Sequence, residues 1–344
     1  MREIAFLFAG QGAQYPGMGQ SLWANSPKAR EVFEMADQER PGTSQQCFSG
    51  DKAQLSATIN TQPCVFAVDL AAAAALEEQG LRPGAVAGFS LGELSAVTFA
   101  GMLSYEEGFK LVCKRAQFMD EAARENRGVM AAILNVQGRL IEEICANYED
   151  VWPVNYNCES QTVIAGGKED VLRVCTEITK ARGKSIMLPV SGAFHCRHME
   201  KAARNLKDYL EDINVSDLQT EAYSNYTAGP YVSFRYKELL TRQMINPVRW
   251  QHTMVNMYQA GIDIFIEVGP GKTLSNLAKK IVPQAEVYNL SEYDDLGKIV
   301  EALNARKIEP PPAASPDDSS CFPPREENHP YRLRRPSLGG GLVC

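Results

Sequence analysis

The stretch AVAGFSLGELSAVTFA, residues 85–100, decides the fold class of this 344-residue chain. Residues 85–89 form a short apolar run, which predicts a buried strand, and residues 91–100 have the pattern of a helix. Between the two lies Gly88-Phe-Ser90-Leu-Gly92, a G-x-S-x-G sequence in a strand–turn–helix context. The pattern predicts a nucleophile elbow, in which the glycines permit a tight turn that exposes the Ser90 hydroxyl. An ordinary turn with a capping serine is the alternative.

Strands and helices of the same kind alternate along the rest of the chain. Short apolar runs predict buried strands at 4–8, 85–89, 151–155, 162–165 and 262–268. Amphipathic stretches between them predict helices, among them 65–78 and 105–124. This alternation predicts an α/β fold with a mainly parallel sheet.

Residues 126–192 have a pattern of their own. The expected order is strand (129–134), helix (140–148), two strands, helix (169–182) and strand (185–188). This βαββαβ order is typical of a ferredoxin-like unit. Because the larger pattern resumes afterwards, we expect a small subdomain at 126–192 inserted in a large domain of residues 1–125 and 193–305. Residues 306–344 are rich in proline, serine and glycine, which predicts a disordered tail.

Composition excludes several classes of function. The net charge of −7 disfavours a nucleic-acid-binding surface, and no run approaches the roughly 18 consecutive apolar residues of a membrane helix. Nine cysteines without a CxxC pair fit a reducing cytoplasm. We expect no metal, because only His195-x-x-His198 could in principle hold one and no carboxylate or cysteine stands at a companion spacing around this pair.

A nucleophilic serine needs a neighbouring base, and the chain has four histidines. His329 lies in the expected tail, His252 begins a predicted helix and is expected to be structural, and His198 is expected to face solvent. His195 lies in a loop between a strand and a helix, where catalytic groups are common, and is the best candidate. Its position in the middle of the chain disfavours a standard lipase or esterase, whose histidine comes near the C-terminus.

Arg115 is a second candidate. In the predicted helix 105–124, apolar residues stand three and four positions away on both sides, so Arg115 points into an apolar face. A buried arginine needs an anionic partner. That partner is either a carboxylate of the protein itself or a carboxylate of the substrate.

Seven short segments together carry a resemblance to a known family. They are AGQGAQ (9–14), GFSLGE (88–93), KRAQFM (114–119), VNYN (154–157), GAFHC (192–196), QMINPV (243–248) and EVGPGK (267–272). In this order they resemble the malonyl-CoA:acyl-carrier-protein transacylases, the acyltransferases of fatty-acid and polyketide synthesis. The resemblance covers residues 2–305. It implies a hydrolase-like large domain with a ferredoxin-like insert.

The resemblance also implies a ping-pong reaction. Ser90 attacks the malonyl thioester of coenzyme A with His195 as base, and the phosphopantetheine thiol of an acyl carrier protein then takes the malonyl group. Coenzyme A thioester is a substrate, so no cofactor is expected. We expect a cytoplasmic monomer that uses neither nucleic acid nor membrane.

Four further positions receive roles from the resemblance. The backbone N–H groups of Gln11 and Leu91 would form the oxyanion hole. The backbone carbonyl of Gln243 would orient the histidine in place of a carboxylate. Arg115 would bind the malonyl carboxylate, and its planar guanidinium suits a bidentate pair.

The chain departs from the family pattern at two positions, with Phe89 where histidine is usual and Ala9 where proline is usual. Neither change removes a group that performs the chemistry. A serine thioesterase and a non-enzymatic carrier-protein-binding module are the rival functions; the second would be expected to have lost Ser90 or His195. Within the transferases, a trans-acting polyketide synthase acyltransferase stays open beside the fatty-acid enzyme.

Overall fold

The computed structural model describes residues 3–306 and contains two sheets. The larger sheet has five strands in the order β7-β2-β1-β8-β9, and every neighbouring pair is parallel. These strands are β1 (Glu3–Phe8), β2 (Ala85–Gly88), β7 (Glu221–Tyr223), β8 (Ile262–Val268) and β9 (Glu286–Leu290). Phe8 pairs with Gly88 on one side and Val268 on the other, so three central strands end at one edge. Loops at this edge are the usual place for a site in such sheets.

Fourteen α-helices and two short 3₁₀ helices occur within residues 3–306. They are α1 (Gln20–Asn25), α2 (Pro27–Glu39), α3 (Thr43–Ser49), α4 (Lys52–Ser56), α5 (Thr58–Glu78), α6 (Leu91–Phe99), α7 (Tyr105–Glu125), α8 (Gly138–Cys145), α9 (Lys168–Lys180), η1 (Arg197–Met199), α10 (Glu200–Glu211), η2 (Ser233–Arg235), α11 (Tyr236–Gln243), α12 (Trp250–Gln259), α13 (Thr273–Ile281) and α14 (Tyr293–Arg306).

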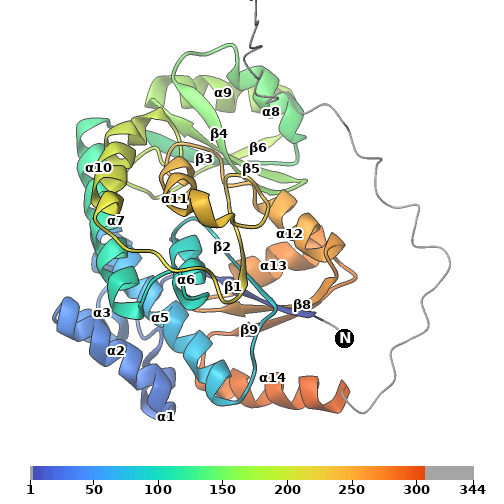
Figure 1. Ribbon diagram of the computed structural model, residues 1–344. Coiled ribbons are helices and arrows are strands. Elements are labelled where there is room, and N and C mark those ends of the chain that lie inside the picture. The colour runs from blue at the N-terminus through green and yellow to red at the C-terminus, as the bar shows by residue number, and fades with distance from the viewer. Residues whose placement is uncertain (1–2, 307–344) are drawn as a thin grey trace, which may run out of the picture. The chain divides into compact units, whose positions relative to one another are not determined.

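Helices cover both faces of the larger sheet (Figure 1). Because side chains alternate along a strand, Phe6 and Phe8 of β1 share one face, where both contact the ring of Phe99 of α6. On the opposite face, Leu7 lies in a core cluster with residues of α12 and α13, including Trp250. The result is a layer of helices on each side of the sheet.

Helix α5 is the central helix of the core. It is long and apolar enough to cross a membrane by length and composition, but 89% of its most apolar window is buried inside the fold. It packs against α2, α6 and α7. It begins at Thr58 rather than at the expected residue 65, because its first turns carry polar residues such as Thr61 and Gln62, which are nevertheless buried.

The smaller sheet confirms the βαββαβ expectation. Its strands are β3 (Val129–Leu134), β4 (Val151–Cys158), β5 (Gln161–Gly166) and β6 (Lys184–Met187). They pair antiparallel in the order β4-β5-β3-β6, which is the ferredoxin-like arrangement, and α8 and α9 supply residues to its separate core. The fold class is therefore as expected, while the boundaries 126–192 stay a prediction. Residues 307–344, on which the prediction of a disordered tail falls, lie outside the described residues, and α14 extends to Arg306.

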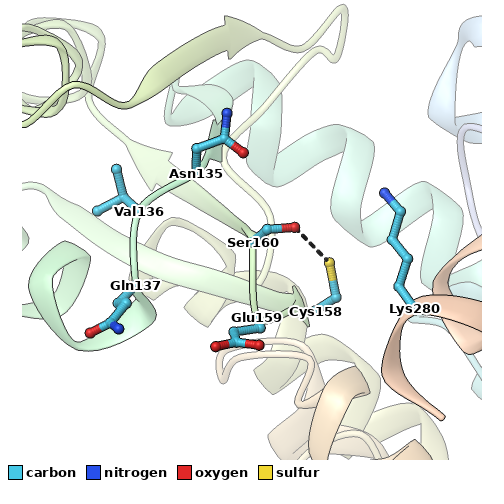
Figure 2. A pocket seen from close by; sticks show the side chains of 7 residues that line it. All are labelled: Asn135, Val136, Gln137, Cys158, Glu159, Ser160 and Lys280. Carbon is cyan, nitrogen blue, oxygen red and sulfur yellow. Dashed lines mark hydrogen bonds between the residues drawn. The ribbon is translucent and has the colours of Figure 1, made fainter. Parts of the chain in front are cut away.

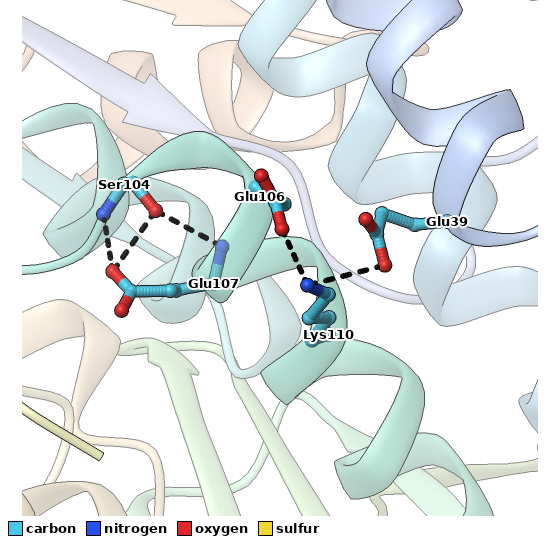
Figure 3. A network of polar contacts seen from close by, with 5 residues as sticks. All are labelled: Glu39, Ser104, Glu106, Glu107 and Lys110. Carbon is cyan, nitrogen blue, oxygen red and sulfur yellow. Dashed lines mark hydrogen bonds and ion pairs between the residues drawn. The ribbon is translucent and has the colours of Figure 1, made fainter.

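Helix α7, which carries Arg115, is fixed at its first turn (Figure 3). Ser104 and Glu107 form a capping box, in which the Ser104 hydroxyl accepts from the Glu107 amide and the Glu107 carboxylate accepts from Ser104. Lys110 forms an ion pair with Glu39 at the end of α2, with 3.4 Å between Nζ and Oε2. These contacts anchor the start of the helix that carries Arg115.

Candidate active site

Ser90 occupies a strained turn between β2 and α6. Its backbone angles, φ 53° and ψ −99°, are ones that residues with side chains rarely adopt. The two flanking glycines are required by space: a Cβ at Gly88 would lie 1.9 Å from the Gly92 carbonyl, and a Cβ at Gly92 would lie 2.2 Å from the Phe8 carbonyl oxygen. The turn is therefore the predicted nucleophile elbow in its geometry, and the alternative of an ordinary capped turn is not what the chain forms.

Asn225, which comes after β7, holds the elbow from the neighbouring strand. Its Oδ1 accepts from the Ser90 amide at 2.7 Å, and its Nδ2 donates to the Gly88 carbonyl at 2.7 Å. The Ser90 amide is thus occupied. The next amide, that of Leu91, is the first of α6, where no carbonyl within the helix can accept it. Asn225 was not anticipated from the sequence, because β7 has only three residues and so gives no clear periodicity to locate the loop after it.

The loop after β1 lies directly against the elbow. A Cβ at Gly10 would meet the Phe89 carbonyl oxygen at 2.5 Å, which shows how closely the two backbones approach. Gln11 is the next residue, and its side chain donates to Thr58 of α5 at 3.3 Å. The structure thus brings the loop that contains Gln11 to the elbow. Phe89 itself stacks edge-on against Trp250, with 5.5 Å between ring centroids.

Ser90 and His195 form a hydrogen-bonded pair. The distance from Ser90 Oγ to His195 Nε2 is 2.6 Å, and that from His195 Nδ1 to the Gln243 carbonyl oxygen is 2.8 Å. A carbonyl can only accept, so Nδ1 carries the proton and Nε2 is left free to accept from the serine hydroxyl. A carbonyl therefore stands where a serine triad usually has a carboxylate.

The surroundings of His195 keep its ring neutral. Burial lowers the pKa of His195 to about 4, and the positive charge of Arg115 contributes to this lowering, while the bond to the Gln243 carbonyl acts in the opposite direction. The side chain is 4% exposed. At neutral pH this histidine is a neutral imidazole, whose Nε2 can act as a base toward the Ser90 hydroxyl.

Arg115 lies in the same site, fully buried. Its Nη1 donates to Gln62 at 2.8 Å, and its Nη2 donates to Gln243 Oε1 at 2.9 Å and to Ser90 Oγ at 3.3 Å. No carboxylate of residues 3–306 lies within ion-pair distance of the guanidinium, and Nε has no partner there. The alternative of an internal salt bridge is therefore not what the described residues show. A buried cation held only by neutral groups is suited to receive an anion.

The side chain of Gln243 connects these groups and was not anticipated, since only its backbone carbonyl was expected to have a role. Its Nε2 donates to the Ser90 carbonyl at 2.6 Å and to Glu93 Oε2 at 2.9 Å. Glu93 is also buried and accepts from the hydroxyl of Tyr231. Burial raises the pKa of Glu93 to about 7, although these hydrogen bonds lower it in part.

The other histidines lie outside this arrangement. The expectation that His198 faces solvent is wrong: its side chain is 14% exposed, and its Nε2 lies 2.6 Å from Asp150 Oδ1 in the small subdomain. His252 lies in α12, and His329 is outside the described residues. No cluster of three or more potential metal ligands occurs within residues 3–306.

A surface hollow of about 370 Å³ lies elsewhere, and the site residues do not line it (Figure 2). Its lining residues come from turns of the small subdomain and from α13: Asn135, Val136, Gln137, Cys158, Glu159, Ser160 and Lys280.

An elbow serine, a neutral histidine oriented by a carbonyl and a buried arginine define an enzyme of the acyl-transfer class. Comparison with known proteins places it further: the family model described as acyl transferase domain matches residues 5–301, and the chain belongs to that family. Its relatives include the malonyl CoA-acyl carrier protein transacylases of Bacillus subtilis, 35% identical over 88% of this chain and 98% of the relative, and of Escherichia coli, 34% identical over 88% of this chain and 100% of the relative.

Solved structures agree with this placement. The malonyl CoA-acyl carrier protein transacylase of Clostridium perfringens has a TM-score of 0.86 at 35% identity, and the match covers 89% of this chain and 98% of that one. A malonyl-transacylase in complex with its type II PKS acyl-carrier protein has a TM-score of 0.84 at 31% identity, covering 87% and 99% of the two chains.

Proposed function

We propose that this protein transfers a malonyl group from coenzyme A to the phosphopantetheine thiol of an acyl carrier protein, through an acyl-serine at Ser90. The observation that carries the proposal is a chain of two hydrogen bonds, from the Gln243 carbonyl to His195 and from His195 to Ser90 Oγ. Arg115 Nη2 lies 3.3 Å from Ser90 Oγ. Family membership and the names of the relatives support it.

In the first half-reaction Ser90 becomes acylated. As Ser90 Oγ bonds to the thioester carbon, its proton passes to His195 Nε2. The oxyanion that forms is stabilised by the backbone N–H groups of Leu91 and Gln11, which lie on the helix start and the loop at the elbow. The C–S bond then breaks, and His195 gives its proton to the departing coenzyme A thiolate. An imidazolium whose pKa is held near 4 gives up that proton readily.

The second half-reaction repeats these steps with a different nucleophile. The carrier thiol gives its proton to His195 and attacks the ester carbon. As the C–O bond breaks, His195 passes that proton to Ser90 Oγ, which restores the hydroxyl. A thioesterase would use water at this point. The two functions differ in what happens without carrier protein: a transferase releases one equivalent of coenzyme A and stops, whereas a thioesterase continues.

We assign to Arg115 the role of binding the free carboxylate of the substrate. A malonyl group bound to Ser90 would bring its free carboxylate into a site where the guanidinium has only neutral partners. A charge pair formed in this buried place is stronger than one at the surface. Acetyl-coenzyme A has no carboxylate, so the site is expected to discriminate against it.

The acyl carrier protein is the proposed partner, and we further propose that the enzyme is a cytoplasmic monomer that binds neither nucleic acid nor membrane. The seven cysteines described within residues 3–306 are all free thiols, which fits a reducing compartment. Supply of malonyl units for fatty-acid synthesis is the proposed role. Polyketide synthesis is the second candidate, favoured by the similarity to a malonyl-transacylase in complex with a PKS carrier.

Intact-mass measurement tests the proposal. The protein is incubated with malonyl-, methylmalonyl- or acetyl-coenzyme A, and carrier proteins of the fatty-acid and polyketide types are then added. The wild type should gain a malonyl group that moves to the carrier, and Ser90→Ala should gain none. An adduct that persists in Ser90→Ala would place the nucleophile elsewhere, and steady hydrolysis without carrier would indicate a thioesterase.

A further inference from the structure

Glu93 lies inside the elbow helix, three residues after Ser90, and is surrounded by hydrogen-bond donors. Its carboxylate accepts from the Tyr231 hydroxyl on Oε1 and from Gln243 Nε2 on Oε2, the latter at 2.9 Å. The backbone of Asn225 and the side chain of Ser224 also lower the pKa of this carboxyl in part. Its side chain is 0% exposed, so no solvent can replace any of these partners. In its ionised form this carboxylate can only accept, and the Tyr231 hydroxyl and the Gln243 amide nitrogen are the donors.

The amide of Gln243 has two chemically different ends, and its neighbours decide which way it points. Arg115 offers only donors, so the amide oxygen must face it for the 2.9 Å bond to form. The amide nitrogen must then find acceptors on the other side, where it meets the Ser90 carbonyl at 2.6 Å and Glu93 Oε2. If the amide turned over, a nitrogen donor would face the guanidinium and an oxygen would face two acceptors.

We propose that Glu93 is a positioning residue that sets the preference for malonyl over acetyl groups, because it holds the Gln243 amide with its oxygen toward Arg115. The proposal rests on the proposed function, in which Arg115 binds the substrate carboxylate. Glu93 does not touch the reacting atoms. It acts through Gln243, which keeps Nη2 of Arg115 at its place beside Ser90 Oγ. Its negative charge also counteracts the burial that lowers the pKa of Arg115 to about 10.

Two variants test this. Glu93→Met keeps the length of the side chain and removes both acceptor oxygens, so the Gln243 amide loses one of its two fixed acceptors. Glu93→Gln keeps the shape and one oxygen but introduces an NH₂ group, which is a donor and cannot accept the bond from Gln243 Nε2. Tyr231→Phe is the matched control, because it removes a donor from the other carboxylate oxygen and leaves the bond between Glu93 and Gln243 in place.

The measurement is the ratio of the rates at which malonyl- and acetyl-coenzyme A acylate Ser90, followed by intact mass. Reaction of Ser90 with phenylmethylsulfonyl fluoride, which carries no carboxylate, reports the reactivity of the serine itself. We expect the ratio to fall about ten- to a hundredfold in Glu93→Met, the range for a hydrogen bond with a charged partner. In Glu93→Gln it should fall by more than about threefold but by less than in Glu93→Met. The ratio should stay within about threefold in Tyr231→Phe, and sulfonylation should stay within about threefold in all three variants.

The proposal is overturned if the folded Glu93 variants keep the wild-type ratio, or if malonylation, acetylation and sulfonylation all fall by the same factor, which would indicate a structural role only. If Glu93→Met does not fold, Glu93→Gln decides alone. Failure of the proposed function is seen separately, in the wild type, as equal or absent acylation by the two thioesters.

Discussion

Replacement of Arg115 by alanine is the most decisive perturbation of this site. Arg115 is 1% exposed. The free energy of a buried charge pair therefore applies to it, and not the roughly 0–1 kcal/mol typical of a surface pair. Removing one partner of a buried pair costs about 3–5 kcal/mol, which corresponds to roughly a 150- to 5,000-fold loss in rate. Acylation by malonyl-coenzyme A should fall by this factor in Arg115→Ala.

Acylation by acetyl-coenzyme A should hold or rise in the same variant, because acetyl leaves the guanidinium without an anion in the wild type and gains nothing from it. Both rates are followed by intact mass with limiting enzyme. Arg124→Ala is the control: it lies on the same helix, its side chain is 76% exposed, and it pairs with Asp120 at the surface. That variant should change both rates by less than about threefold. If Arg115→Ala lowers both rates in parallel, Arg115 is structural and another residue selects the substrate.

The same geometry leads to three more predictions. His195→Ala should slow acylation of Ser90 by about 10²–10⁴-fold, the usual contribution of a positioned base, and a loss smaller than about tenfold would exclude His195 as that base. Since the pKa of His195 is lowered to about 4, its basic form persists down to that pH. The rate of acylation by acetyl-coenzyme A, which does not use Arg115, should therefore stay level from about pH 7 to 5 and fall only near pH 4; a midpoint of about 6.5, the ordinary value for histidine, would contradict this. Gly92→Ala should lower the free energy of unfolding in urea by about 1–3 kcal/mol or more, because the new Cβ would lie 2.2 Å from the Phe8 carbonyl oxygen. An unchanged urea midpoint would show that the elbow can accommodate a Cβ at this position.

The sequence alone determined the features that depend on neighbours along the chain. The elbow around Ser90 is such a feature, because the apolar strand, the glycine spacing and the start of a helix are all encoded within residues 85–100. The βαββαβ order of the small subdomain was equally readable, since each of its elements has a clear period. Arg115 could be placed in the interior because helical spacing decides which face a residue occupies. His195 was reached by elimination among four histidines.

Which polar groups meet depends on the tertiary structure. Asn225 reaches the elbow across a parallel strand pair, and Gln62 reaches Arg115 from a different helix. His198, expected at the surface, is largely buried and pairs with Asp150 of the small subdomain. Hydrogen bonds between residues far apart along the chain, such as Gln243 to Glu93, leave no periodic trace in either segment. Backbone propensity and side-chain pattern act locally, whereas these bonds form only after the sheet and its covering helices have brought the segments together.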